Sequence, residues 1–259
     1  MQNLIKNTPV LILCGGKGSR LSEETKKTPK PLIKIDKHPI LFHIMKIYLK
    51  HGFKKFVLLT GYKHHLFEQY FFKELPNKIK QKPIISKKNK TILFKNFDVK
   101  ILNTGLNTLT GARILKYKKF MQNEKYFAVT YGDGLANVNL GRAFKTFYKT
   151  SFEGLMCATN PQEKFGTLKI KNNMVTNFKE KEKDPKKWIN IGFFIFKKIF
   201  FKYLDKHTML EEKPLKKITN KKKLMVYKHL GQYNCMDTLH EKKIIQNMLK
   251  KKLIAPWFK

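Results

Sequence analysis

Short apolar runs and amphipathic segments alternate along the first 160 residues of the chain. Residues 9–13 ("PVLIL") and 55–61 ("KFVLLTG") are almost wholly apolar and each leads into glycine, which is typical of strands buried on both faces of a sheet. Between them, residues 40–52 carry apolar side chains at helical spacing. Pro39 suits the first position of this helix and Gly52 its end. The order strand, helix, strand predicts a right-handed βαβ unit.

The alternation continues beyond this unit, and its period changes at residue 165. Apolar residues with period two about Asn172–Asn173 predict an antiparallel hairpin. A helix is expected near Leu210–Ile218, and a further strand in "PLIKIDKHP" (31–39). The other predicted elements are strands at 95–105, 126–134, 154–160, 190–198 and 224–238, and helices at 65–75, 140–151 and 240–252.

These elements predict one α/β domain over residues 1–259 with an added β-hairpin region. A chain of 259 residues is long enough for one substantial core, and two separate domains would be hard to fit. Residues 1–8 form a short N-terminal extension in this prediction, and 78–90 is the loosest stretch.

The net charge of +37 is the most unusual feature of the composition. Only three of the 55 basic residues are arginines, Arg20, Arg113 and Arg142, and lysines are spread over almost every segment. Proteins that bind nucleic acid usually need the planar fork of arginine at bases and phosphates. We therefore expect no specific nucleic-acid partner, although the charge should attract small anionic substrates.

The cysteines and the apolar runs bear on the compartment. Cys14, Cys157 and Cys235 are too few and too scattered for a disulfide framework or a zinc knuckle. The longest apolar runs are far too short for a signal peptide or a membrane span. We expect a cytoplasmic protein without a membrane partner.

Three glycines follow the first predicted strand in "CGGKGSR" (14–20). Glycine allows backbone N–H groups to approach phosphate oxygens, and Arg20 would add a charge-assisted fork. The spacing fits neither the dinucleotide fingerprint G-x-G-x-x-G nor a Walker loop. On these residues alone, a plain turn and a phosphate site both remain open.

The longer segment "LCGGKGSRLSEETKKTPKPLIKI" resembles the signature of the sugar-1-phosphate nucleotidylyltransferases, G-G-x-G-[TS]-R-L followed by P-K-P. The segments "NTGLNTLTGARI", "VTYGDGLANV", "NIGFFIF" and "MDTLHEK" follow in the order of that family. The resemblance covers nearly the whole chain from Pro9 to Trp257, and it is greatest for the glucose-1-phosphate cytidylyltransferases of the family.

The resemblance implies a fold and an activity. The fold would be Rossmann-like and of the GT-A type, a mixed sheet flanked by helices, with the sugar-binding part at about 160–240. The activity would be Mg²⁺-dependent transfer of CMP from CTP to a sugar 1-phosphate, with release of pyrophosphate, by in-line attack on the α-phosphorus. The family also implies a homo-oligomer and a place in nucleotide-sugar supply for surface polysaccharides such as O-antigen.

The resemblance also assigns roles to residues on the nucleotide side. Arg20 would hold the triphosphate, and Lys30 would neutralise charge as the α-phosphorus is attacked. Gly111 would be small enough to admit the nucleotide. The residues implied to bind CTP are Leu13, Cys14, Gly15, Gly16, Lys17, Gly18, Ser19, Arg20, Lys30, Thr108, Gly111, Arg113 and Gly132.

Two of the six aspartates have settings that suit a metal. Mg²⁺ usually takes one or two carboxylates together with substrate phosphates. Asp133 follows a predicted strand in "YGDG", and Asp237 follows another in "CMDT". The family pattern makes both of them metal ligands.

The sugar side departs from the family at several positions. The resemblance gives Glu180 and Lys181 contacts with the acceptor, together with Asn190 and Gly192. Glu182 stands where proline is usual, Ile191 stands where glycine is usual and could narrow the sugar pocket, and "GQYN" replaces a G-F-W pattern. Three alternatives therefore remain open: another nucleotide such as dTTP or UTP, another sugar or polyol phosphate, and a catalytically silent basic binding protein.

Overall fold

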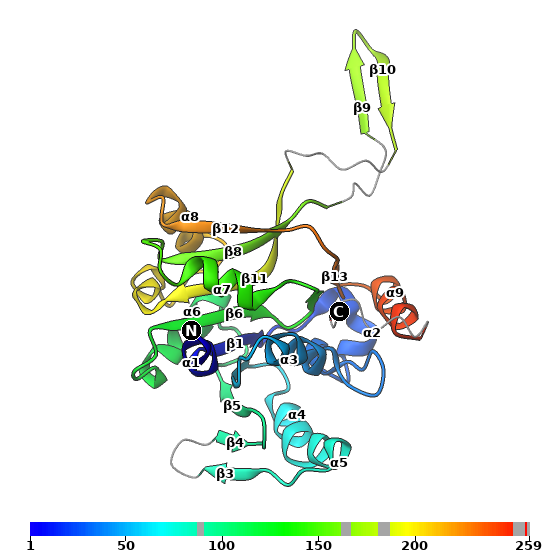
Figure 1. Cartoon of the computed structure of the whole chain (residues 1–259). Coiled ribbons are helices and arrows are strands. Elements are labelled where there is room, and N and C mark those ends of the chain that lie inside the picture. Colours follow the sequence, from blue (N-terminus) through cyan, green and yellow to red (C-terminus); the bar gives the residue numbers. More distant parts are fainter. Residues whose placement is uncertain (87–90, 162–166, 181–186, 251–256, 258–259) are drawn as a thin grey trace.

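A twisted mixed sheet runs through the middle of the molecule (Figure 1). The computed structural model describes residues 1–86, 91–161, 167–180, 187–250 and 257. Within these residues nine strands form the sheet in the order β12-β8-β11-β6-β1-β2-β5-β4-β3. Strands β6, β1, β2 and β5 are parallel, whereas β11 is antiparallel to both β6 and β8. The bounds are β1 (Pro9–Cys14), β2 (Lys55–Thr60), β3 (Ile84–Ser86), β4 (Thr91–Leu93), β5 (Asp98–Asn103), β6 (Tyr126–Tyr131), β8 (Gly154–Thr159), β11 (Ile189–Lys197) and β12 (Leu224–His229).

Helices cover both faces of the sheet. Side chains alternate across a strand, so Val10 and Ile12 of β1 enter one buried cluster and Leu11 and Leu13 enter the other. The first cluster includes side chains of α3 (Ile40–Lys50), α4 (His64–Gln69), α5 (Leu75–Ile79) and α7 (Leu140–Phe147). The second includes α6 (Thr110–Tyr117) and α8 (Lys213–Asn220). Shorter or peripheral helices are α1 (Gln2–Asn7), α2 (Ser22–Thr25) and α9 (Leu239–Lys250).

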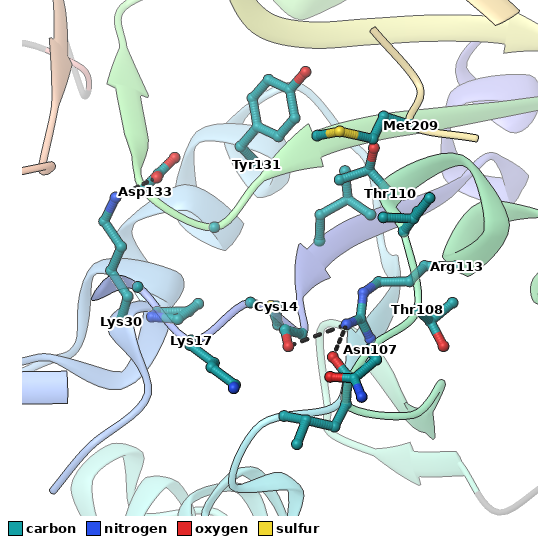
Figure 2. A pocket seen from close by; sticks show the side chains of 18 of the residues that line it. Cys14, Lys17, Lys30, Asn107, Thr108, Thr110, Arg113, Tyr131, Asp133 and Met209 are labelled. Carbon is teal, nitrogen blue, oxygen red and sulfur yellow. Dashed lines mark hydrogen bonds and ion pairs between the residues drawn. The ribbon is translucent and has the colours of Figure 1, made fainter. Parts of the chain in front are cut away.

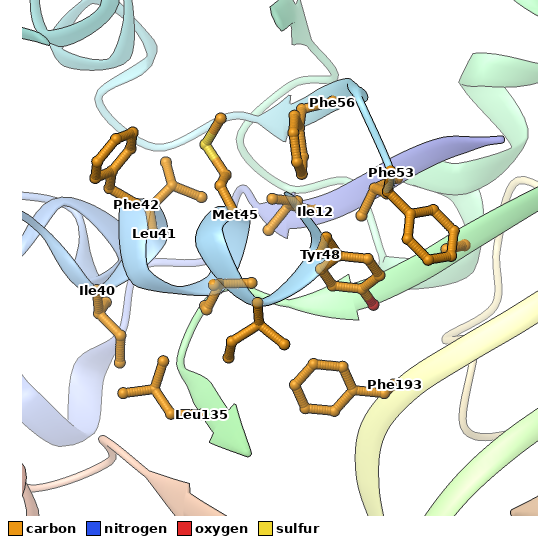
Figure 3. Close-up of a cluster of buried hydrophobic side chains, with 14 of the residues drawn as sticks. Ile12, Ile40, Leu41, Phe42, Met45, Tyr48, Phe53, Phe56, Leu135 and Phe193 are labelled. Carbon is orange, nitrogen blue, oxygen red and sulfur yellow. The ribbon is translucent and has the colours of Figure 1, made fainter. Parts of the chain in front are cut away.

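Helix α3 forms the centre of the first cluster. Its Leu41, Met45 and Tyr48 pack beside Ile12 of β1 and Phe193 of β11 (Figure 3). Each fully buried side chain of this kind contributes about 1.5–3 kcal/mol. This packing positions β1, and therefore the start of the glycine-rich loop after Cys14.

A second, small sheet matters for the site. β7 (Gly134–Ala136) pairs antiparallel with β13 (Tyr233–Cys235), with Gly134 opposite Cys235. This pairing joins residues that are about 100 positions apart in the sequence. It brings the segment after β6 next to the segment before α9.

The predicted hairpin stands clear of the main sheet (Figure 1). β9 (Thr167–Lys171) and β10 (Met174–Lys179) pair antiparallel, and the turn residues Asn172 and Asn173 have positive φ values of 47° and 60°. Asparagine tolerates this left-handed region better than most residues. The hairpin prediction is confirmed.

The α/β class and the mixed sheet flanked by helices are also confirmed, but one local expectation was wrong. Residues 31–39 form no strand: Lys30–Leu32 is a 3-10 turn, and Lys34 and Pro39 make an isolated bridge. Residues 2–7 form helix α1, whose Ile5 enters the core, and the loose stretch contains β3. Among the described residues, no helix is long and apolar enough to cross a bilayer.

Candidate functional site

A cavity of about 520 Å³ opens at the carboxyl ends of β1 and β6. Figure 2 shows Lys30 and Asp133 at one end, Arg113 and Thr108 at the other, and Cys14 between them. Ligands of open α/β sheets bind at this edge of the strands. The predicted residues that line the cavity are Leu13, Cys14, Gly15, Gly16, Lys17, Gly18, Arg20, Lys30, Thr108, Arg113, Gly132 and Asp133.

Close packing explains two glycines of the loop after β1. A Cβ on Gly15 would lie 2.1 Å from Cζ of Arg113. Gly18 has a φ of 67°, and a Cβ there would lie 3.0 Å from the side chain of Thr25. Gly16, by contrast, faces open space. The loop therefore exposes backbone to the cavity while its ends are held by neighbours.

Arg113 ties together three strand ends below this loop. Its Nη1 donates to the carbonyl oxygens of Thr60, the last residue of β2, at 3.0 Å and of Gly105, after β5, at 2.7 Å. Its Nη2 donates to the carbonyl oxygens of Gly15, after β1, at 3.1 Å and of Leu106 at 3.0 Å. The sequence expectation was a contact with the nucleotide. In the structure these guanidinium hydrogen bonds go to the protein, so Arg113 shapes the floor of the cavity.

Lys30 lies between two carboxylates. Its Nζ is 2.6 Å from Oδ2 of Asp133 and also donates to Oδ1 of Asp237. Arg20 Nη1 donates to the other oxygen of Asp237 at 2.8 Å. Lys30 is nearly buried, with 11% of its side chain exposed, compared with 74% for Arg20. The structure therefore brings together Arg20 and Lys30, predicted to contact the phosphates, with the two predicted metal ligands, Asp133 and Asp237.

The charges in this cluster shift each other's protonation. Burial alone would lower the pKa of the Lys30 ammonium, but the carboxylates of Asp133 and Asp237 outweigh it and raise that pKa. Burial would raise the pKa of Asp237, but the hydrogen bond and charge of Lys30 together with Arg20 lower it. Lys30 is thus held as a cation and Asp237 as an anion.

The carboxylate pair can hold a divalent cation. The β7–β13 pairing sets the spacing, because the N–H of Met236 donates to the carbonyl oxygen of Asp133 at 3.0 Å. An ammonium group already sits between the two carboxylates, so a positive charge fits there. Ligand atoms of Asp133, Asp237 and Cys235 all lie within 4.8 Å of one another. Burial, with the two carboxylates adding to it, raises the pKa of the Cys235 thiol to about 12.

Tyr131 borders the cavity beside the predicted sugar residues. Gly192 has a φ of 77°, and a Cβ there would lie 2.2 Å from the Tyr131 ring, so only glycine fits. Asn190 Oδ1 accepts from the N–H of Gly192 at 2.8 Å. The hydroxyl of Tyr131 donates to Glu211, which also accepts from Thr110 at 2.9 Å. Burial and the neighbouring Glu211 carboxylate raise the pKa of Tyr131.

Sequence reasoning did not select Tyr131 and Glu211. The position of Tyr131 at a strand end, directly before Gly132 and Asp133, was an available signal. Glu211 carries no local signal, because its contacts come from residues about 80 and 100 positions away.

Several predicted residues lie apart from the cavity. A Cβ on Gly111 would lie 2.7 Å from the carbonyl oxygen of Thr208, so its small size serves chain packing and not nucleotide entry. Ser19 does not line the cavity, and Ile191, at 1% exposure, packs into the core instead of narrowing a sugar pocket. Glu180 follows β10 on the exposed hairpin. Lys181 and Glu182 lie outside the described residues.

Comparisons with known proteins agree with this geometry. A profile of the nucleotidyl transferase family matches residues 9–240. The chain is 38% identical over 233 residues to the Bacillus subtilis protein named "Probable glucose-1-phosphate cytidylyltransferase", covering 88% of this chain and 91% of that protein. It is 33% identical over 252 residues to the glucose-1-phosphate cytidylyltransferase of Salmonella typhimurium, covering 95% and 97%.

The fold has counterparts among solved structures. A UDP-glucose pyrophosphorylase complexed with UDP-glucose superposes with a TM-score of 0.69 over 95% of this chain and 99% of that one, at 18% identity. This likeness supports the fold alone, whereas the family match and the two cytidylyltransferases extend over most of the sequence. The chain therefore belongs to the nucleotidyl transferase family.

Proposed function

We propose that this protein transfers CMP from CTP to glucose 1-phosphate, giving CDP-glucose and pyrophosphate. Two relatives that match most of the chain carry the name of this activity. The observation that carries the proposal is the placement of Lys30 between Asp133 and Asp237 at one end of a glycine-lined cavity. In that arrangement the Lys30 ammonium can bind a phosphate group, and the adjacent carboxylates of Asp133 and Asp237 can bind a metal ion.

CTP would enter with its base near Arg113 and its phosphates near Lys30. Gly16 and Lys17 are exposed and line the cavity between these two ends. Arg20 is mostly exposed, and its Nη1 donates to Asp237, so the remaining N–H groups of its guanidinium can turn to the triphosphate. Guanidinium groups suit phosphate oxygens because they donate in pairs.

The chemistry requires positioning and charge neutralisation. A phosphate oxygen of the sugar phosphate is already anionic at neutral pH and can attack the α-phosphorus without a strong base on the protein. The Lys30 ammonium would meet the negative charge that develops on the α-phosphate, and pyrophosphate would leave. Mg²⁺ held by Asp133 and Asp237 would polarise the phosphates when bound.

The acceptor would lie toward Tyr131 and Asn190, at the β6–β11 side of the cavity. Glu180 and Lys181 are also expected to contact the acceptor. Glu180 directly follows β10 of the hairpin, and this hairpin stands clear of the main sheet in Figure 1. We propose that the protein is a homo-oligomer. Leu168, Ile170 and Phe178 of the hairpin are more than half exposed, which suits burial against another copy. A cytoplasmic location and a role in surface-polysaccharide supply complete the proposal.

The deciding experiment measures pyrophosphate release with each of CTP, UTP, dTTP and GTP, crossed with a panel of sugar 1-phosphates. We expect Mg²⁺-dependent release with CTP and glucose 1-phosphate. Release with another nucleotide or acceptor alone would identify one of the alternative transferases, and no release with any pair would contradict the proposal.

Two variants connect the assay to the site. Asp133→Asn should reduce turnover on the order of 10²–10³-fold, as expected for loss of one charge-stabilising group. Asp205→Asn is the matched control, because this carboxylate accepts from the N–H of His207 at 2.8 Å in a separate turn. Near-normal turnover of Asp133→Asn would refute its role as a metal ligand.

A further inference from the structure

A thiol lies at the carboxylate pair. Cys235 is the last residue of β13 and stands two positions before Asp237. Alternate residues of an extended chain project to the same side, and the pairing of Cys235 with Gly134 sets it beside Asp133. The sulfur and the two carboxylate oxygens lie within 4.8 Å of one another.

The proposed CMP transfer gives this thiol no task. Mg²⁺ is a hard cation that takes oxygen ligands, and the attacking group comes from the sugar phosphate. The other two cysteines are also unlike Cys235, because Cys14 and Cys157 are buried at 1% and 0% exposure. Cys235 is the partly exposed cysteine of the chain.

The site already accommodates a positive group. The ammonium of Lys30 donates to both Asp133 and Asp237, and it marks the point that a cation would occupy. Tetrahedral ligation with Zn–O of about 2.0 Å and Zn–S of about 2.3 Å places ligand atoms about 3.5 Å apart. Side-chain rotations that move the ligand atoms by about an ångström would therefore bring the sulfur and the two carboxylate oxygens to bonding distance of such an ion.

The donor set selects the class of ion. One thiolate and two carboxylates favour a borderline-soft divalent cation of the Zn²⁺ class over Mg²⁺, because sulfur binds Mg²⁺ poorly. We propose that Asp133, Cys235 and Asp237 form a site for such a thiophilic cation, and that its binding removes both carboxylates from Mg²⁺ and stops turnover.

The binding step balances without a redox change. The thiol of Cys235 loses its proton to solvent as the S–metal bond forms. The Lys30 ammonium leaves the space between the carboxylates, and the incoming ion takes its place. Three anionic ligands then face one divalent ion, and the adjacent charges of Lys30 and Arg20 offset the excess.

The first test needs no substrate. The full chain is titrated with Co²⁺ alone, and separately with Cd²⁺ alone, while thiolate-to-metal charge-transfer absorption is recorded in the ultraviolet. We expect the band in the wild-type protein and its loss in Cys235→Ser, Cys235→Ala and Asp237→Asn. Cys157→Ala is the matched control and should retain the band, because that sulfur lies in the core. Circular dichroism identifies any variant that fails to fold, in which case the other Cys235 variant decides.

The second test measures inhibition by Zn²⁺ in excess Mg²⁺, and this arm rests on the proposed function. Each variant is compared with its own Mg²⁺-supported rate. The Zn²⁺ concentration for half-inhibition should rise at least about tenfold in Cys235→Ser and stay unchanged in Cys157→Ala.

The two tests can fail separately from the proposed function. Absence of the charge-transfer band, or a band that persists in both Cys235 variants, overturns the thiophilic site whether or not CTP turns over. Equal inhibition of wild type and Cys235→Ser overturns the proposed link between the site and turnover. A band without any CTP turnover would support the metal site while contradicting the proposed function.

Discussion

Replacing Lys30 by methionine tests how the charge cluster is held together. The change keeps an unbranched side chain but removes the ammonium that Asp133 and Asp237 share. Breaking a buried ion pair costs about 3–5 kcal/mol, whereas exposed pairs are worth about 0–1 kcal/mol. Lys30 is nearly buried, but the two carboxylates are 24% and 23% exposed, so we expect a loss of about 2 kcal/mol. For a chain of this size that lowers Tm by roughly 4–8 °C.

The assay is thermal unfolding with and without Mn²⁺, in the absence of nucleotide. A cation that binds only the folded state raises its stability, so Mn²⁺ should raise Tm more in Lys30→Met than in wild type, where the ammonium competes. Lys34→Met is the control, since the Lys34 side chain is 59% exposed and its ion pair with Glu74 is long, at 3.8 Å, and therefore weak. An unchanged Tm of Lys30→Met, or an equal Mn²⁺ effect in both proteins, would refute the ammonium as the occupant of the cation position.

Three further predictions concern other parts of the molecule. Arg113→Met should lower the free energy of unfolding by about 2–4 kcal/mol, because the buried carbonyl groups of Thr60 and Gly15 lose a charged donor. Chemical denaturation measures the change, and a loss below about 0.5 kcal/mol would contradict the role of Arg113 in holding the strand ends together. Gly192→Ala should impair acceptor binding more than CTP binding, because its Cβ would displace the Tyr131 ring; equal changes in the two KM values would argue against it. Burial and the charge of Lys46 lower the pKa of His38 to about 4. Between about pH 6.5 and pH 4 the unfolded chain therefore binds more protons at this residue than the folded protein does. As the pH is lowered through that window, the free energy of unfolding should fall by on the order of 1 kcal/mol after solvent screening. Denaturation of His38→Gln at several pH values should show a flatter dependence, and an unchanged slope would count against this assignment.

Local pattern was sufficient for much of the fold. The β1–α3–β2 unit follows from apolar spacing, Pro39 and Gly52, because each of these signals acts within a few residues. The segment 31–39 shows the limit of this reasoning. Leu32, Ile33 and Ile35 are buried as their pattern indicates, but a proline has no N–H to pair, and the segment turns instead of joining a sheet.

The candidate site was harder to predict because its contacts are long-range. Asp133 and Asp237 could be singled out one at a time, from their positions after strands. Their distance from Lys30, however, depends on the register of β7 against β13, which no local signal sets. The same register adds Cys235, which the sequence presented only as one of three scattered cysteines.

The bracing by Arg113 has a consequence for the order of events in nucleotide binding. The end of the cavity near Arg113 is cross-linked by hydrogen bonds to three strand ends, whereas the end near Lys30 is closed by charges that must exchange partners. In the proposed binding mode, the base would meet a surface that is already complete, while the triphosphate would first compete for Lys30 and Arg20. Docking of the base would be fast and weakly selective for phosphate number, and the slower exchange of ion pairs would commit the nucleotide to reaction.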